Sequence, residues 1–273
     1  MVAPELIRMT SHGVTLLGDR NRPGGVTLAF TERCGGVSKG GYSSLNLSDG
    51  CGDDEACVAE NRRRALAALG AQALADGLVC PRQVHGSKVL TIAEGALTPA
   101  EGRAAAREGA DAIVCATKDV AVLLCFADCV PVVLAAPGAF AVIHSGWRGT
   151  RARIAAKALR ALMDAASCTA KDVVGYIGPH IGVEDYEVSA ELAASFAEDF
   201  GGEVVAGERQ LDLGLAVEMA LVEAGMDRAS VACVEESTAS TTERFFSYRA
   251  QNGNCGRHGA LACMLSNERG EVR

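Results

Sequence analysis

The most constraining feature of the sequence is a long apolar stretch near its centre, DVAVLLCFADCVPVVLAAPGAFAVIHSGW, which extends from Asp119 to Trp147. It contains two runs rich in β-branched residues, separated by Pro137 and Gly138. A Pro-Gly pair between two such runs favours a turn. The stretch therefore predicts a buried β-hairpin at the centre of the molecule.

Helices and strands are expected to alternate irregularly along the rest of the chain. Apolar residues at helical spacing predict helices over 55–69, 150–166, 190–198 and 213–224, while 98–109 fits either a helix or a surface insertion. Strands are expected within 13–19 and 26–36, and over 78–83, 88–93, 173–177 and 245–249. Because regular βαβ alternation is missing, the fold class expected is α+β. With no internal repeat and no boundary signal, we expect one domain over 1–273.

Charge and cysteine content narrow the classes of function. The formal net charge of −8 with no long basic run disfavours nucleic acid, because phosphate neutralisation needs clustered Lys and Arg. Asp128 and Pro131 interrupt the longest apolar run, which argues against a membrane span, and we do not expect a signal peptide in the first residues. Eleven cysteines without a framework spacing fit reduced thiols. We expect a cytoplasmic protein, either a monomer or a homodimer.

Three residues predict a metal site. His144 ends the second apolar run, and a two-residue turn makes Cys129 its diagonal neighbour on one face, with Cα atoms about 7 to 8 Å apart. His85 lies in QVHG between two expected strands. A thiolate and two imidazoles suit zinc, and three protein ligands leave the fourth position open for chemistry. The chain is therefore expected to be a metalloenzyme.

Other interpretations of these residues remain open. A single Cys on a strand is more often a core thiol, and a single His is more often a hydrogen-bonded structural residue. Cys125 is a candidate fourth ligand, which would close the site and make the ion structural. Asp128 would point to the opposite strand face from Cys129, where it orients backbone or neighbouring side chains.

Two motifs are candidates for binding an anion or another small ligand. HSGWRGT leaves a strand and enters a helix, so Arg148 and the first backbone amides can bind phosphate or carboxylate. The alternative is a tight strand-to-helix turn that needs the glycines. Arg33 and Asn46 lie in a loop rich in glycine and serine and are further candidates, although turn chemistry explains much of that loop.

Several segments together resemble one family, in its order and over nearly the whole chain: TERCGGVS, SLNL, the NR of AENRRR, RQVHG, ADA, FADCVP, HSGWRG, IGP, DYEV, FFSYR and the GR at Gly256. This is the YfiH-type family, also called laccase-domain or multicopper polyphenol oxidoreductase proteins and linked to peptidoglycan editing. The resemblance implies a four-layer αββα sandwich and zinc on the residues matching His85, Cys129 and His144. Departures from the family pattern are Ser145, Asp185 and Ser237.

The resemblance also implies purine nucleoside chemistry: phosphorolysis of adenosine, inosine and methylthioadenosine, with phosphate as co-substrate, and deamination of adenosine. Copper is expected to bind the same nitrogen and sulfur ligands in vitro. Alternatives are a copper polyphenol oxidase, an amidase acting on a muropeptide precursor, and a binding module with a structural metal. Five histidines in total are too few for the mononuclear and trinuclear centres of a multicopper oxidase.

Overall fold

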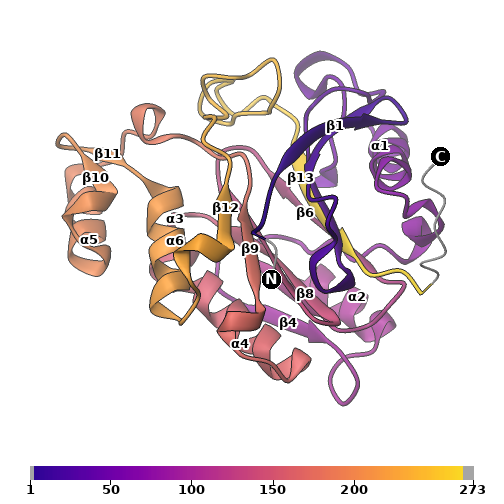
Figure 1. Cartoon of the computed structure of the whole chain (residues 1–273). Coiled ribbons are helices and arrows are strands. Elements are labelled where there is room, and N and C mark those ends of the chain that lie inside the picture. The colour runs from indigo at the N-terminus through magenta and orange to yellow at the C-terminus, as the bar shows by residue number, and fades with distance from the viewer. Residues whose placement is uncertain (1–2, 267–273) are drawn as a thin grey trace.

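The computed structural model describes residues 3–266, and its frame is a pair of facing β-sheets (Figure 1). One sheet has the order β1-β2-β3-β13-β6 and is antiparallel throughout. The other has the order β12-β9-β7-β8-β5-β4, with parallel pairing only at its two ends. The strands of the first sheet are β1 (Ile7–Ser11), β2 (Val14–Gly18), β3 (Thr27–Thr31), β6 (Ala121–Phe126) and β13 (His258–Cys263). Those of the second are β4 (Val89–Ile92), β5 (Ala112–Cys115), β7 (Val130–Ala136), β8 (Ala139–Ser145), β9 (Val174–Ile177) and β12 (Val231–Cys233).

Alternation of side chains along the strands produces the layers. In β6, Val122 and Leu124 pack into the core between the sheets, while Leu123 packs outward with α1 (Glu55–Ala68). The outer face of the second sheet packs against α4 (Ile154–Ala166), α5 (Ala190–Phe200) and α6 (Leu213–Glu223). Helix, sheet, sheet and helices form four layers, which confirms the expected α+β sandwich. A short hairpin, β10 (Val205–Ala206) with β11 (Gln210–Leu211), completes the fold.

The central apolar stretch is only in part the expected hairpin. β7 and β8 pair in the expected register, with Pro131 opposite His144, and turn at Pro137 and Gly138. The first run, however, is two strands, because β6 belongs to the other sheet. The chain crosses between the sheets at Asp128, whose φ of 88° is left-handed. Cys129 therefore lies at the corner between the two sheets rather than inside a strand.

The expected helices are present with some changes in their bounds. α1, α5 and α6 confirm three of them, and residues 98–109 form α2 (Pro99–Glu108), which begins with a capping box between Thr98 and Glu101. The segment 150–166 contains two helices, α3 (Trp147–Arg151) and α4. Arg153, with a left-handed φ of 56°, separates them.

Two expected strands are wrong, for different physical reasons. In 78–83 only Val79 forms a β-bridge, and the side chain of Gln83 binds the backbone N–H and C=O of Cys125 in place of a neighbouring strand. In 245–249 the aromatic residues Phe245 and Phe246 are buried, but their backbone turns, with the N–H of Phe245 donating to Thr241.

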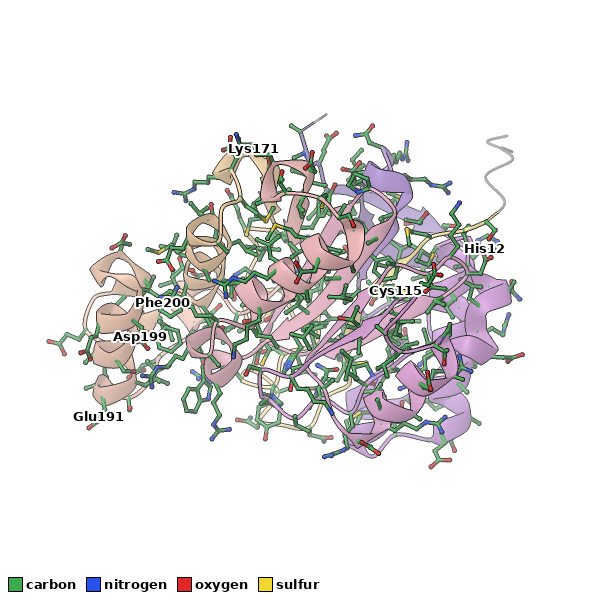
Figure 2. All side chains as sticks on the ribbon, turned by 90° about the horizontal axis from the view of Figure 1, so that it is seen from below. His12, Cys115, Lys171, Glu191, Asp199 and Phe200 are labelled. Carbon is green, nitrogen blue, oxygen red and sulfur yellow. The ribbon has the colours of Figure 1, made fainter. Side chains whose placement is uncertain are left out.

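The remaining expected strands are confirmed as β2, β3, β4 and β9. Figure 2 shows Cys115 of β5 within the molecule and His12, at the turn after β1, on its periphery. Within residues 3–266, no helix combines the length and apolar character needed to cross a membrane.

Candidate metal centre

His85, Cys129 and His144 come together from three separate elements. His85 lies in the loop before β4, Cys129 at the corner between β6 and β7, and His144 in β8. One ligand atom from each lies within 4.8 Å of the others, and the two imidazole rings stand edge to face with centroids 4.7 Å apart. Zinc bonds to nitrogen and sulfur are about 2.0 to 2.3 Å long, so ligand atoms this close together can reach one ion after a small adjustment of the side chains. We call these three residues the His-Cys-His cluster.

A buried carboxylate, Asp111, organises the cluster. Asp111 is fully buried and accepts a hydrogen bond from Nδ1 of His144 at 2.8 Å, which leaves Nε2 of that ring free for an ion. The same carboxylate accepts backbone N–H bonds from His85 at 3.0 Å and Gly86 at 2.8 Å. One side chain therefore orients His144 and holds the loop that carries His85.

The electrostatics of Asp111 fit this role. Burial alone would raise the pKa of its carboxyl group, but the hydrogen bonds from His144 and from the backbone of Gly86 outweigh that effect and lower the pKa. The carboxylate is therefore ionised and can only accept, so Nδ1 of His144 is the donor in their hydrogen bond.

The thiol of Cys129 is also prepared for metal binding. Burial alone would raise its pKa, but the charge of His144 and hydrogen bonds from both imidazoles lower the pKa to about 6. Burial alone would lower the pKa of His144, but the Cys129 thiolate and Asp111 outweigh that effect and raise the pKa of the imidazole to about 9. The donor set, two imidazoles and a thiolate, fits zinc.

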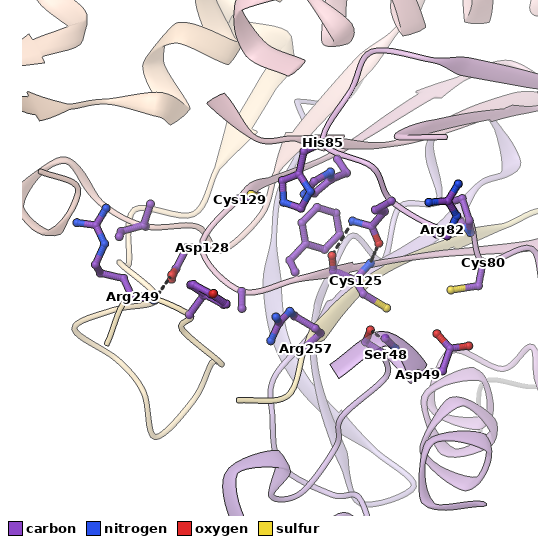
Figure 3. Close-up of a pocket in the computed structure, with 18 of the residues that line it drawn as sticks. Ser48, Asp49, Cys80, Arg82, His85, Cys125, Asp128, Cys129, Arg249 and Arg257 are labelled. Carbon is purple, nitrogen blue, oxygen red and sulfur yellow. Dashed lines mark hydrogen bonds between the residues drawn. The ribbon is translucent and has the colours of Figure 1, made fainter. Parts of the chain in front are cut away.

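The cluster is open rather than closed. Within residues 3–266 no further His, Cys, Asp or Glu joins it. The side chain of Cys125 packs on the outer side of its sheet, towards Cys80 (Figure 3), so it is not a fourth ligand. His85 is exposed, Cys129 half-buried and His144 buried, which leaves one side of the cluster facing a pocket.

Gly146 lies directly against the cluster. A methyl group at this position would lie 3.1 Å from the sulfur of Cys129 and 3.3 Å from Cδ2 of His85. The φ of Gly146 is −78°, which alanine also adopts, so crowding is the main effect of Gly146→Ala.

We expect Gly146→Ala to weaken zinc binding about 10- to 100-fold, as changes beside metal ligands commonly do. Competition with a chromophoric chelator measures this affinity. Gly202→Ala is the matched control, because a methyl group there meets nothing within 4 Å. Unchanged zinc affinity in Gly146→Ala would place the bound ion outside the His-Cys-His cluster.

The pocket beside the cluster has a volume of about 900 Å³, at the upper end of the range for small-molecule sites. Tyr186 and Tyr248 contribute aromatic surface, and Tyr248 is 56% exposed. Burial raises the pKa of Tyr186 to about 12, with a further contribution from Cys129, so its phenol is neutral. The wall also carries four arginines: Arg107 and the three that Figure 3 labels, Arg82, Arg249 and Arg257. In a chain of net charge −8, such a wall favours an anionic or phosphate-bearing ligand.

Asp128 holds the pocket's loops in place. One carboxylate oxygen accepts from the hydroxyl of Thr238 at 2.7 Å and the other from the backbone N–H of Arg249, also at 2.7 Å. The carbonyl of Asp128 accepts from the backbone N–H of Ile181. Asp128 thus fixes three segments around Cys129 and is a positioning residue.

None of Arg33, Asn46 and Arg148 lines the pocket. Arg33 donates to the carbonyls of Ser43 and Thr242 and lies 4.2 Å above the ring of Phe246. Arg148 is exposed and lies 4.6 Å from the ring centroid of Trp147. Both guanidinium groups therefore contact aromatic rings of the protein, and neither lines the pocket.

Asn46 reaches the pocket only through other residues. It is fully buried, and its side-chain oxygen accepts from the backbone N–H of Arg257 at 2.8 Å and of Ser48 at 3.1 Å. Both partners line the pocket. Asn46 therefore positions the backbone of two pocket residues.

Sequence reasoning assigned no role to Asp111, Tyr186 or Arg257. Their segments, ADA, DYEV and the GR at Gly256, were recognised only as parts of the family pattern. Asp111 carried a usable signal, since a charged residue at the start of a fully apolar strand is costly to bury without partners. No comparable sequence signal marks the arginines of the pocket, because exposed arginines are common in proteins.

Two departures from the family pattern contact each other. The hydroxyl of Ser237 donates to the carboxylate of Asp185 at 2.6 Å and accepts from the backbone N–H of Gly182 at 2.9 Å. These two departures thus form a hydrogen-bonded carboxylate and hydroxyl. The exchange leaves the His-Cys-His cluster unchanged.

A three-ligand cluster of zinc-type donors, open to a pocket of this size, defines a candidate metalloenzyme. A family model described as multi-copper polyphenol oxidoreductase laccase matches residues 27–265. The chain belongs to this family.

Named relatives and one solved structure extend the comparison. A purine nucleoside phosphorylase of Deinococcus radiodurans is 36% identical over 258 residues, covering 93% of this chain and 94% of that protein. A protein named adenosine deaminase RL5, from an unknown prokaryotic organism, is 35% identical over 242 residues, or 84% of this chain and 90% of that protein. The crystal structure of YlmD from Geobacillus stearothermophilus has a TM-score of 0.84 at 29% identity and covers 96% of this chain and 100% of that one.

Proposed function

We propose that this protein is a zinc-dependent purine nucleoside phosphorylase that acts on adenosine, inosine and methylthioadenosine and also deaminates adenosine. The observation that carries the proposal is the open His-Cys-His cluster in the wall of a pocket of about 900 Å³. The names of relatives, purine nucleoside phosphorylase and adenosine deaminase, support the choice of substrate class.

The ion is held by His85, Cys129 and His144 in this proposal. Bound there, zinc supplies a Lewis acid, a fixed positive charge that stabilises negative charge developing on the substrate. Tyr186 and Tyr248 offer the aromatic surface on which a purine stacks. Asp128, which joins the loops that carry Ile181 and Arg249, keeps this part of the wall in position.

We assign the binding of orthophosphate to Arg257. Its Nη1 donates to the carbonyls of Cys255 and Gly256, which fixes the guanidinium group in the pocket wall. Among the described residues, Nε and Nη2 donate to no protein acceptor, so they are available to an anion. A guanidinium group binds phosphate through such paired donors.

The reaction itself is a displacement at the sugar. A phosphate oxygen bonds to C1′ of the ribose as the bond from C1′ to the purine nitrogen breaks, and the purine takes up a proton. The products are ribose 1-phosphate and the free base. Deamination would instead add water to the purine ring and release ammonia, so the products distinguish the two reactions.

The test is product analysis with purified, zinc-loaded protein. Adenosine, inosine and methylthioadenosine are incubated with and without phosphate, and bases, inosine and ribose 1-phosphate are resolved by chromatography. We expect phosphate-dependent release of adenine from adenosine, accompanied by some inosine. No phosphate-dependent base from any of the three nucleosides, with zinc bound at one equivalent, would refute the proposal.

We expect Arg257→Ala to raise KM for phosphate about 10- to 100-fold, because a hydrogen bond to a charged group contributes about 1.5 to 3 kcal/mol. Steady-state kinetics with phosphate as the varied substrate measures this. Arg148→Ala and Arg33→Ala, measured alongside, test the assignment made from the sequence. If KM for phosphate rose strongly in Arg148→Ala or Arg33→Ala and not in Arg257→Ala, phosphate would bind beside that other arginine and the assignment to Arg257 would be wrong.

A second candidate function has one finding in its favour. The family description names a laccase, and copper binds imidazole and thiolate strongly. Within residues 3–266 only one such cluster is present, and the chain has five histidines. Oxidation of a phenol at the cluster is therefore testable with copper-loaded protein, whereas a four-copper centre has too few ligands.

A further inference from the structure

A pair of cysteines outside the His-Cys-His cluster lines the same pocket. Cys80 follows α1 in the segment leading to His85, and Cys125 lies in β6. Figure 3 shows their sulfur atoms directed towards one another. The contact between the two thiols lowers the pKa of Cys80 and raises the pKa of Cys125. Neither residue has a part in the proposed nucleoside chemistry.

A half-buried arginine makes the two thiols unequal. Nη2 of Arg62 lies 3.6 Å from the sulfur of Cys80, and Nε is fixed by the carbonyl of Leu47 at 2.8 Å. The contact with Cys125 and the charge of Arg62 lower the pKa of Cys80, whereas the pKa of Cys125 is raised. A thiol beside a guanidinium group has more thiolate character and reacts faster with oxidants.

We propose that Cys80 and Cys125 are a redox-reactive pair that forms a reversible disulfide in the pocket wall when the protein meets hydrogen peroxide. The Cys80 thiolate attacks one peroxide oxygen, the O–O bond breaks and hydroxide leaves, which gives a sulfenic acid on Cys80. The Cys125 thiol then attacks that sulfur, the S–O bond breaks and water leaves. Two thiols and one peroxide become one disulfide and two waters.

The position of the pair links it to the cluster. Gln83 already ties its segment to Cys125, with bonds of 2.8 Å to the backbone N–H and C=O. His85 lies shortly after Cys80 in the chain, and Cys129 shortly after Cys125. The disulfide would therefore join covalently the two segments that carry these ligands.

Peptide mapping tests the proposal on zinc-loaded protein treated with hydrogen peroxide. Trypsin places Cys80 in peptide 65–82, which has no other cysteine, and Cys125 in peptide 119–148, which also contains Cys129. We expect these two peptides to be linked, with the loss of two hydrogen atoms, and to separate on reduction. The link must disappear in Cys125→Ala and persist in Cys115→Ala, a buried thiol that does not line the pocket.

The order of the two steps has its own measurement. In Cys125→Ala, dimedone should trap the sulfenic acid on Cys80, and in Cys80→Ala it should label Cys125 weakly or not at all. If the two peptides are still linked in Cys125→Ala, the disulfide joins Cys80 to Cys129 and the proposal is wrong. The proposal is also wrong if peroxide produces no link in the protein without substitutions. Because the readout is a covalent bond, the result does not depend on whether the nucleoside assay succeeds.

Discussion

Replacing His85 with asparagine is expected to abolish the proposed phosphorolysis, lowering kcat/KM at least about 1000-fold. Loss of one of three ligands removes the ion and its stabilisation of several kcal/mol, and each 1.36 kcal/mol is about tenfold in rate. Asparagine is chosen because His85 has a left-handed φ of 57°, which asparagine tolerates better than alanine. Kinetics and zinc content are measured on the same preparation.

The control for this variant is His12→Asn. His12 has a similar left-handed φ of 49° and is exposed on the periphery, so the same change of residue is made far from the pocket (Figure 2). We expect activity and zinc content to be unchanged there. If His85→Asn kept both its zinc and its activity, the His-Cys-His cluster would not be the catalytic centre.

Asp111→Asn is expected to lower both stability and zinc affinity. The backbone N–H groups of residues 84–86 and the Nδ1–H of His144 all donate to the Asp111 carboxylate. An asparagine amide has only one acceptor oxygen, so its NH2 group would face at least one of these donors, and that pair could not form a hydrogen bond. Breaking a buried charged pair of this kind costs about 3 to 5 kcal/mol. The misoriented imidazole should weaken zinc binding about 10- to 100-fold.

Two measurements separate these effects. Chemical denaturation of the zinc-free protein gives the change in unfolding free energy, and chelator competition gives the zinc affinity. Asp164→Asn, at an exposed position of α4, is the control and should change neither. A variant that is less stable but binds zinc as before would make Asp111 a purely structural residue.

The number of histidines in the chain does not fit the multicopper centre that the family description names. Multicopper chemistry needs many imidazoles, whereas this chain has five histidines, and two of them are in the cluster. His180 and His258 are buried elsewhere, and burial lowers the pKa of both rings, so they are neutral. Residues 3–266 provide a single open site of mixed nitrogen and sulfur donors.

The sequence by itself determined the elements whose signals are local. Helical spacing placed α1, α5 and α6, the Pro-Gly turn set the register of β7 with β8, and that register brought Cys129 near His144. These features depend on residues close together in the chain. Local signals were therefore sufficient for them.

Only the tertiary structure decided which sheet each strand joins and what surrounds the cluster. β6 and β7 are equally apolar, so composition could not show that the chain changes sheet at Asp128. The side chain of Gln83 binds the backbone of Cys125 in place of a neighbouring strand, and Asp111 is hydrogen-bonded to His144, 33 positions away in the sequence. Such contacts depend on long-range packing, in which residues far apart in the chain satisfy one another's buried polar groups, and no local pattern encodes them.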